Sequence, residues 1–114
     1  MLDASRELVA AVARDLARDG LVHGSSGNVS ARTGELVAVT ATGAVLEHVT
    51  AAEVVVVDLD GTLVAGEYAP TSELALHLGA YRRFDAGAVV HSHSPAATAV
   101  GCARDELPVI HYQL

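Results

Sequence analysis

The sequence lacks lysine altogether, and its seven basic residues besides histidine are all arginine. Without a lysine, the chain can neither form a Schiff base with a carbonyl substrate nor supply the lysine of a nucleotide-binding phosphate loop. Acidic residues outnumber arginines, which gives a formal net charge of −7. Because nucleic acids and anionic membranes bind clustered basic surfaces, neither is expected as a partner.

Cysteine is nearly absent as well, since Cys102 is the single one. No disulfide framework can form within the chain, which suits a reducing compartment. The N-terminus mixes Asp3, Arg6 and Glu7 with apolar residues, unlike a signal peptide, and no apolar run approaches the length that spans a bilayer. We therefore expect a cytoplasmic protein.

Hydrophobic patterning predicts one α/β domain over residues 1–114, because 51% of the residues are hydrophobic and can form a core. The periodicities predict helices at about 3–19, 72–84 and 95–103, and strands at about 29–32, 36–40, 54–59 and 88–93. A capping box at 50–53 predicts a short helical turn, and Asp60-Gly61 predicts a hairpin. We expect an α/β sandwich with a partly antiparallel sheet. The last apolar run has no turn, cap or polar tail, so we expect the domain to be C-terminally incomplete.

The strongest chemical signal is the H-x-H of His91 and His93. Alternate residues of a strand face the same side, so both imidazoles could grip one divalent cation, with Ala88-Val89-Val90 as a buried strand that holds them rigid. Glu73 is expected in the first turn of a helix that begins near 70–72, where its carboxylate could be aimed at the histidines. The residues alone leave another interpretation open: two half-buried strand histidines and a solvated glutamate at a helix start.

Three segments rich in small and hydroxyl residues could bind an anion through backbone N–H groups: 24–28, 41–43 and 71–72. In a chain without lysine, a phosphate would need such a cradle together with a metal. Each segment alone is also explained as an ordinary turn. No dinucleotide or nucleotide phosphate-loop motif is present, so a nucleotide ligand has no support.

Five motifs together resemble the class II aldolase/adducin family, most closely its fuculose-phosphate aldolase branch. They are GSSGNVSAR, TATG, PTSELALH, AVVHSHSPAATAV and LPVIHY, in the family's order and at about its spacing. The resemblance implies a three-layer α/β/α fold with a central mixed, largely antiparallel sheet. It also implies that the phosphate of a substrate is held by six residues: Gly27, Asn28, Thr42, Gly43, Thr71 and Ser72.

The resemblance further implies one zinc ion per subunit. The expected ligands are His91, His93 and Glu73, with a third histidine expected beyond residue 114. Glu73 would also be the catalytic acid/base, and Tyr112 would reach a neighbouring subunit's site as a proton donor within a homotetramer. With that third histidine missing from the sequence, the chain is expected to be metal-free or to bind zinc only weakly.

The implied activity is cleavage of a ketose 1-phosphate, resembling fuculose 1-phosphate, to dihydroxyacetone phosphate and an aldehyde. Dehydration of methylthioribulose 1-phosphate, epimerisation of a pentulose phosphate and a non-enzymatic adducin-like interaction module are the alternatives. Glutamate at position 73 favours cleavage or dehydration, because the family's epimerases tend to have aspartate there. His23, His48 and His77 match no ligand position and are interpreted as ordinary helix or loop histidines, and His111 is not a convincing third ligand.

Overall fold

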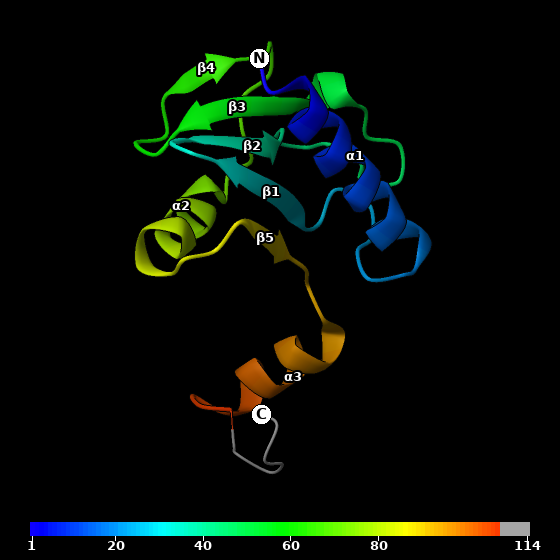
Figure 1. The fold of residues 1–114 in the computed structure, drawn as a ribbon. Coiled ribbons are helices and arrows are strands. Elements are labelled where there is room, and N and C mark those ends of the chain that lie inside the picture. Colours follow the sequence, from blue (N-terminus) through cyan, green and yellow to red (C-terminus); the bar gives the residue numbers. More distant parts are fainter. Residues whose placement is uncertain (108–114) are drawn as a thin grey trace.

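A computed structural model describes residues 1–107 of the chain (Figure 1). Helix α1 (Asp3–Arg18) comes first, and strands β1 (Asn28–Thr33) and β2 (Leu36–Thr40) form a hairpin after it. A single 3-10 turn, η1 (Ala51–Glu53), leads into a second hairpin of β3 (Val54–Asp58) and β4 (Leu63–Ala65). Helix α2 (Leu74–Arg83), strand β5 (Ala88–His91) and helix α3 (Pro95–Ala103) complete the described part.

The strands form one five-stranded sheet in the order β4-β3-β2-β1-β5. All four pairings between these strands are antiparallel. Strand β5 enters the sheet beside β1 after the chain has passed through α2, and its register places Asn28 opposite His91. This pairing brings the first residue of β1 to the histidine motif, although 63 positions separate the two in sequence.

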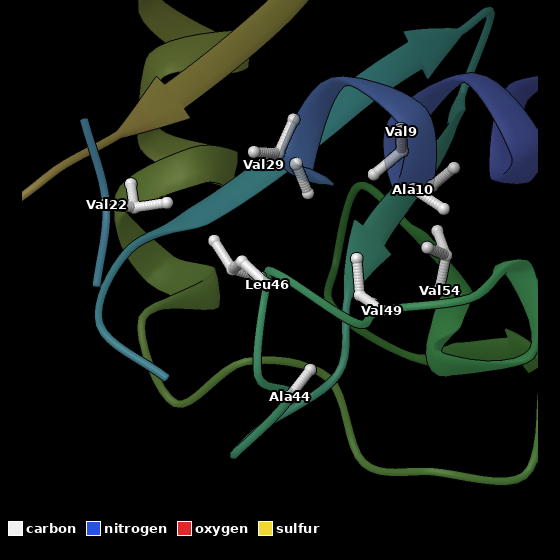
Figure 2. Packing of buried hydrophobic residues seen from close by; sticks show 10 residues of the cluster. Val9, Ala10, Val22, Val29, Ala44, Leu46, Val49 and Val54 are labelled. Carbon is white, nitrogen blue, oxygen red and sulfur yellow. The ribbon is translucent and has the colours of Figure 1, made fainter. Parts of the chain in front are cut away.

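Two apolar layers lie on opposite faces of the sheet, because neighbouring strand residues point to opposite sides. On one face α1 packs its buried stripe against Val29, Ala38 and Val54, and the loop residues Leu46 and Val49 close this core (Figure 2). On the other face α2 packs against the alternate strand residues. The second core consists of Val37, Val39, Val55, Val57, Leu78 and Tyr81. The expected three-layer α/β/α class is confirmed.

The packing of β3 between two helices explains why its sequence is a run of four valines. Val54 to Val57 are all fully buried, since α1 covers one face of this strand and α2 covers the other. The predicted capping box also forms before this strand, and in it the Thr50 backbone N–H donates to Glu53 Oε2 over 3.0 Å. The predicted hairpin at Asp60-Gly61 joins β3 to β4, and Gly61 adopts the positive φ of 88° that such a turn requires.

Two local predictions are wrong. The segment Ala88-Val89-Val90 is not a buried strand: Val90 is 51% exposed, because β5 is an edge strand whose outer face no described element covers. Helix α2 begins at Leu74, later than expected, since Pro70 pairs with Ala41 and the Thr71 N–H donates to Thr40 O in extended geometry. Glu73 is therefore the residue before the helix, and not a member of its first turn.

Helix α3 lies beyond β5, away from both faces of the sheet (Figure 1). Its start is as expected, with Pro95 in the first turn and the Ser94 hydroxyl accepting from the Ala97 N–H. Within the described residues no helix is both long and apolar enough to cross a membrane. The predicted proton donor, Tyr112, lies outside the described residues.

Candidate active site

Three loops meet at one end of the sheet, where β1 begins and β2 ends. The isolated bridge between Ala41 and Pro70 joins two of them, and the Thr42 N–H donates to Ala69 O over 3.0 Å. Together the loops surround a pocket of about 220 Å³. Its lining residues are Ser25, Ser26, Gly27, Asn28, Ala41, Thr42, Gly43, Thr71, Ser72, Glu73 and His93. All six residues expected to hold a phosphate are in this set.

The pocket offers hydrogen-bond donors but no cationic side chain from lysine or arginine. Among the hydrogen bonds of residues 1–107, the backbone N–H groups of Gly43 and Ser72 have no protein acceptor. Ser72 also lies one residue before the N-cap of α2, where the helix dipole is positive. These features suit an anion that is bound by backbone and hydroxyl groups.

Glu73, His91 and His93 form a cluster at the pocket's edge. One potential ligand atom from each lies within 4.8 Å of the other two. His91 Nδ1 is 2.7 Å from Glu73 Oε2, whereas His93 Nε2 is 4.0 Å from Glu73 Oε1. The imidazole centroids are 4.8 Å apart, although β5 ends at His91 and His93 belongs to the segment after it. Two imidazoles and a carboxylate are a donor set of the kind that holds a catalytic zinc ion, so the residues present fit this metal.

The Glu73 carboxylate is stabilised in its charged form. Asn28 Nδ2 donates to Glu73 Oε2 over 2.7 Å, and this hydrogen bond is the main cause of a lowered Glu73 pKa. His91 and His93 lower the pKa further, while partial desolvation opposes them. Glu73 is therefore ionised at neutral pH, as both a metal ligand and a general base require.

Behind this cluster lies a polar network that the sequence interpretation missed. His77, interpreted as an ordinary helix histidine, is fully buried against the sheet. Its Nε2 is 2.5 Å from Asn28 Oδ1, and its Nδ1 is 2.7 Å from Ser30 Oγ. The Ser30 hydroxyl in turn lies 2.7 Å from the Tyr81 hydroxyl. Burial lowers the pKa of His77 to about 4 and raises that of Tyr81, so both are neutral at pH 7.

Spacing could have revealed this network. Glu73, His77 and Tyr81 follow one another at intervals of four, which places them in line along α2 and its cap. Asn28 and Ser30 are two apart in β1 and so share one face of the sheet. His23 and His48 are exposed and belong neither to the cluster nor to the lining of the pocket.

The sequence of the chain matches the model of one protein family over most of its length. The model of the Class II Aldolase and Adducin N-terminal domain matches residues 7–114, and the chain belongs to this family.

Three individual relatives are similar to almost the whole chain. The chain is 37% identical over 115 aligned residues to a 5-deoxy-D-ribulose 1-phosphate aldolase of Bacillus thuringiensis serovar kurstaki, in a match that covers 98% of this chain and 54% of that protein. It matches a solved L-fuculose 1-phosphate aldolase with a TM-score of 0.86 and 31% identity over 96% of this chain and 53% of that one. The L-fuculose-1-phosphate aldolase of Thermus thermophilus matches with a TM-score of 0.78 and 27% identity, over 96% and 55% of the two chains. The chain thus spans about half the length of these relatives.

Proposed function

We propose that the protein is a zinc-dependent aldolase that cleaves a ketose 1-phosphate, of the L-fuculose 1-phosphate type, to dihydroxyacetone phosphate and an aldehyde. The observation that carries this proposal is that Glu73 belongs both to the phosphate-type pocket and to the metal-type cluster. A substrate bound there would have its phosphate in the pocket and its carbonyl carbon close to the acid/base. The names of the three relatives, all sugar 1-phosphate aldolases, support the same reaction.

The phosphate would be bound by the loops around Gly27, Thr42 and Ser72. With no lysine in the chain, binding depends on N–H and hydroxyl donors and on the dipole of α2. These donors are held by the Ala41–Pro70 bridge and by the Glu73 N–H, which donates to Thr71 Oγ1 over 3.3 Å. The pocket would thus orient the substrate before any bond breaks.

The metal would be held by His91, His93 and Glu73. When bound, zinc supplies a Lewis acid for the negative charge that develops on substrate oxygens as a carbon–carbon bond breaks. The side chains of the three residues are between 25% and 51% exposed, so a substrate can reach them. Convergence of three potential ligands supports an enzyme over an interaction module without metal ligands.

Glu73 would move the proton on the carbon next to the carbonyl. Its carboxylate accepts that proton in the condensation direction and returns it in cleavage. The proton of the aldehyde-side oxygen would be handled by Tyr112, which the family resemblance places at a neighbouring subunit's site in a homotetramer. Only Glu73 of these two groups lies among the described residues.

The test is a substrate screen on zinc-loaded protein, with enzymatic detection of dihydroxyacetone phosphate. The candidates are L-fuculose, L-rhamnulose, 5-deoxy-D-ribulose and methylthioribulose 1-phosphates. Glu73→Gln should lower kcat by about two orders of magnitude and leave the circular dichroism spectrum unchanged. Glu67→Gln removes an exposed carboxylate outside the pocket and is the matched control. Failure to form dihydroxyacetone phosphate from every candidate would refute the proposal.

A further inference from the structure

A continuous line of hydrogen bonds runs from the buried Tyr81 hydroxyl to the Glu73 carboxylate. Its links are Tyr81 to Ser30, Ser30 to His77, His77 to Asn28, and Asn28 to Glu73. The first four residues are buried, each less than 5% exposed, whereas Glu73 opens on the pocket. Within the described residues no buried side-chain polar atom is left without a partner.

The direction of every hydrogen bond in this line follows from the bond at its exposed end, between Asn28 and Glu73. Asn28 Nδ2 donates to Glu73 Oε2, so Oδ1 is the amide atom that Asn28 presents to His77. His77 Nε2 must then carry the ring proton, because Oδ1 has none to give. A neutral imidazole has one N–H, so His77 Nδ1 accepts and the Ser30 hydroxyl donates to it.

The hydrogen bond at the other end of the line, between Tyr81 and Ser30, is compatible with these directions. The Ser30 oxygen, having donated its proton to His77, is free to accept from the Tyr81 hydroxyl at 2.7 Å. Burial keeps Tyr81 protonated and His77 uncharged, so a donor and a single-proton imidazole are present where the line needs them. His91 Nδ1, 3.2 Å from Asn28 Oδ1, adds a second possible donor to that same oxygen.

We propose that His77 is a positioning residue: the Ser30 hydroxyl, by donating to Nδ1, favours the Nε2–H tautomer, and that tautomer keeps the Asn28 amide in the orientation that holds Glu73. The Nδ1–H tautomer would instead turn a lone pair toward Asn28 Oδ1. The amide would then favour the flipped orientation, with its oxygen toward the carboxylate, and the Asn28–Glu73 hydrogen bond would be lost. The buried network thus determines where the Glu73 carboxylate points.

Orientation of the Glu73 carboxylate matters for turnover only if Glu73 is the acid/base, so this part of the inference deepens the proposed function and rests on it. The tautomer of His77 and the orientation of the Asn28 amide do not rest on it, because both are properties of the folded chain without substrate or metal. The test therefore begins with a measurement that is independent of activity.

The first measurement is the nitrogen NMR spectrum of the imidazole rings in the uniformly 15N-labelled chain at pH 7. His77 is assigned from the signals lost in His77→Gln. We expect one protonated and one unprotonated ring nitrogen, with the proton on Nε2. A proton on Nδ1, or an imidazolium, would overturn the proposal even if no other variant could be purified.

Two variants that each remove one buried hydroxyl then separate tautomer selection from general packing. Ser30→Ala removes the donor to His77 Nδ1, so the Nε2–H form should lose its dominance and the Asn28 side-chain amide signal should shift. Tyr81→Phe removes a hydroxyl from the same line and leaves the Ser30 donor, so the His77 tautomer should stay unchanged. The proposal fails if the two variants give the same tautomer.

Zinc affinity tests whether the buried network acts on the metal-type cluster. Groups that orient metal ligands commonly change metal affinity about 10- to 100-fold when removed, so Ser30→Ala should raise the zinc Kd by about tenfold, and Tyr81→Phe by clearly less. Equal effects of the two variants on zinc binding would contradict the proposed positioning. The tautomer measurements decide the inference even if the unmodified chain binds no zinc.

Discussion

Asn28 Nδ2 lies 2.7 Å from Glu73 Oε2, although 45 residues separate the two in sequence. Asn28 is the first residue of β1 and Glu73 caps α2, so one hydrogen bond joins the sheet to the helix that covers it. Both residues also line the pocket. The fold therefore places the pocket and the metal-type cluster around a single carboxylate, as the proposed metal-dependent aldolase would require.

The histidine pair yields the first prediction. His91→Ala and His93→Ala should each raise the zinc Kd by at least about tenfold, because a catalytic-type zinc site needs three or more ligands. Isothermal titration calorimetry with zinc would measure the change. His48→Ala is the matched control, since His48 is exposed and lies outside the cluster, and it should bind zinc as the unmodified chain does. Unaltered zinc affinity in both histidine variants would contradict the assignment.

The pocket yields the second prediction. Ser72→Ala should weaken the binding of dihydroxyacetone phosphate to zinc-loaded protein by roughly tenfold, because a hydrogen bond to a charged group is lost. Thr62→Ala, which removes an exposed hydroxyl in the β3–β4 hairpin outside the pocket, should leave that Kd unchanged. A Ser72 variant that binds dihydroxyacetone phosphate normally would show that its phosphate binds elsewhere.

The sequence was most informative where a local pattern decides the structure. Period-3.6 apolar spacing predicted α1 closely, and the predicted bounds of α3, 95–103, are those of the structure. The start of α2 was predicted too early, because the tertiary bridge between Ala41 and Pro70 holds that segment extended. The burial of β5 was also misjudged, since a β-branched run shows that a strand forms but not whether it is central or at an edge.

The candidate site, like the fold, was predicted only in part. The family motifs named the three residues of the metal-type cluster and the residues of the three loops that line the pocket. His77 was overlooked although it stands four residues from both Glu73 and Tyr81, because this spacing shows that the three lie in line but not what they contact. Its importance comes from contacts with Asn28 and Ser30, which lie 49 and 47 residues away. Only the packing of α2 on the sheet brings these groups together.

Gly27 yields the third prediction. Its φ is +88°, and an added Cβ would lie 2.8 Å from the backbone oxygen of His91 and 2.9 Å from Val22 Cγ1. Gly27→Ala should therefore destabilise the fold by about 2–3 kcal/mol and push His91 away, which would also raise the zinc Kd. Gly24→Ala is the control, because Gly24 has a φ of +58° but no atom near its Cβ position. It should cost only about 1 kcal/mol of backbone strain. Equal losses in urea denaturation would show that the β1–β5 contact adjusts freely.

The last prediction concerns acid stability. Burial lowers the pKa of His77 from 6.5 to about 4 in the folded chain, with the positive charge of His91 as a second cause. Between these two values the unfolded chain binds more protons than the folded one, so the free energy of unfolding falls as the pH falls. The His77 contribution is fully present above pH 6.5, is lost on the way down to about pH 4, and amounts to roughly 3 kcal/mol.

Urea denaturation of the unmodified chain and of His77→Gln, at several pH values from neutral to about 4, would measure this contribution. The glutamine of this variant would keep an amide donor near Asn28 and cannot titrate. The lowered pKa of Glu73 acts in the same direction at lower pH, and the amide donor of the glutamine is chosen to preserve the Asn28–Glu73 hydrogen bond that is its main cause. We expect the unmodified chain to lose more stability than the variant over this window. Parallel pH profiles would show that His77 takes up its proton in the folded state as readily as in the unfolded chain, which its complete burial should prevent.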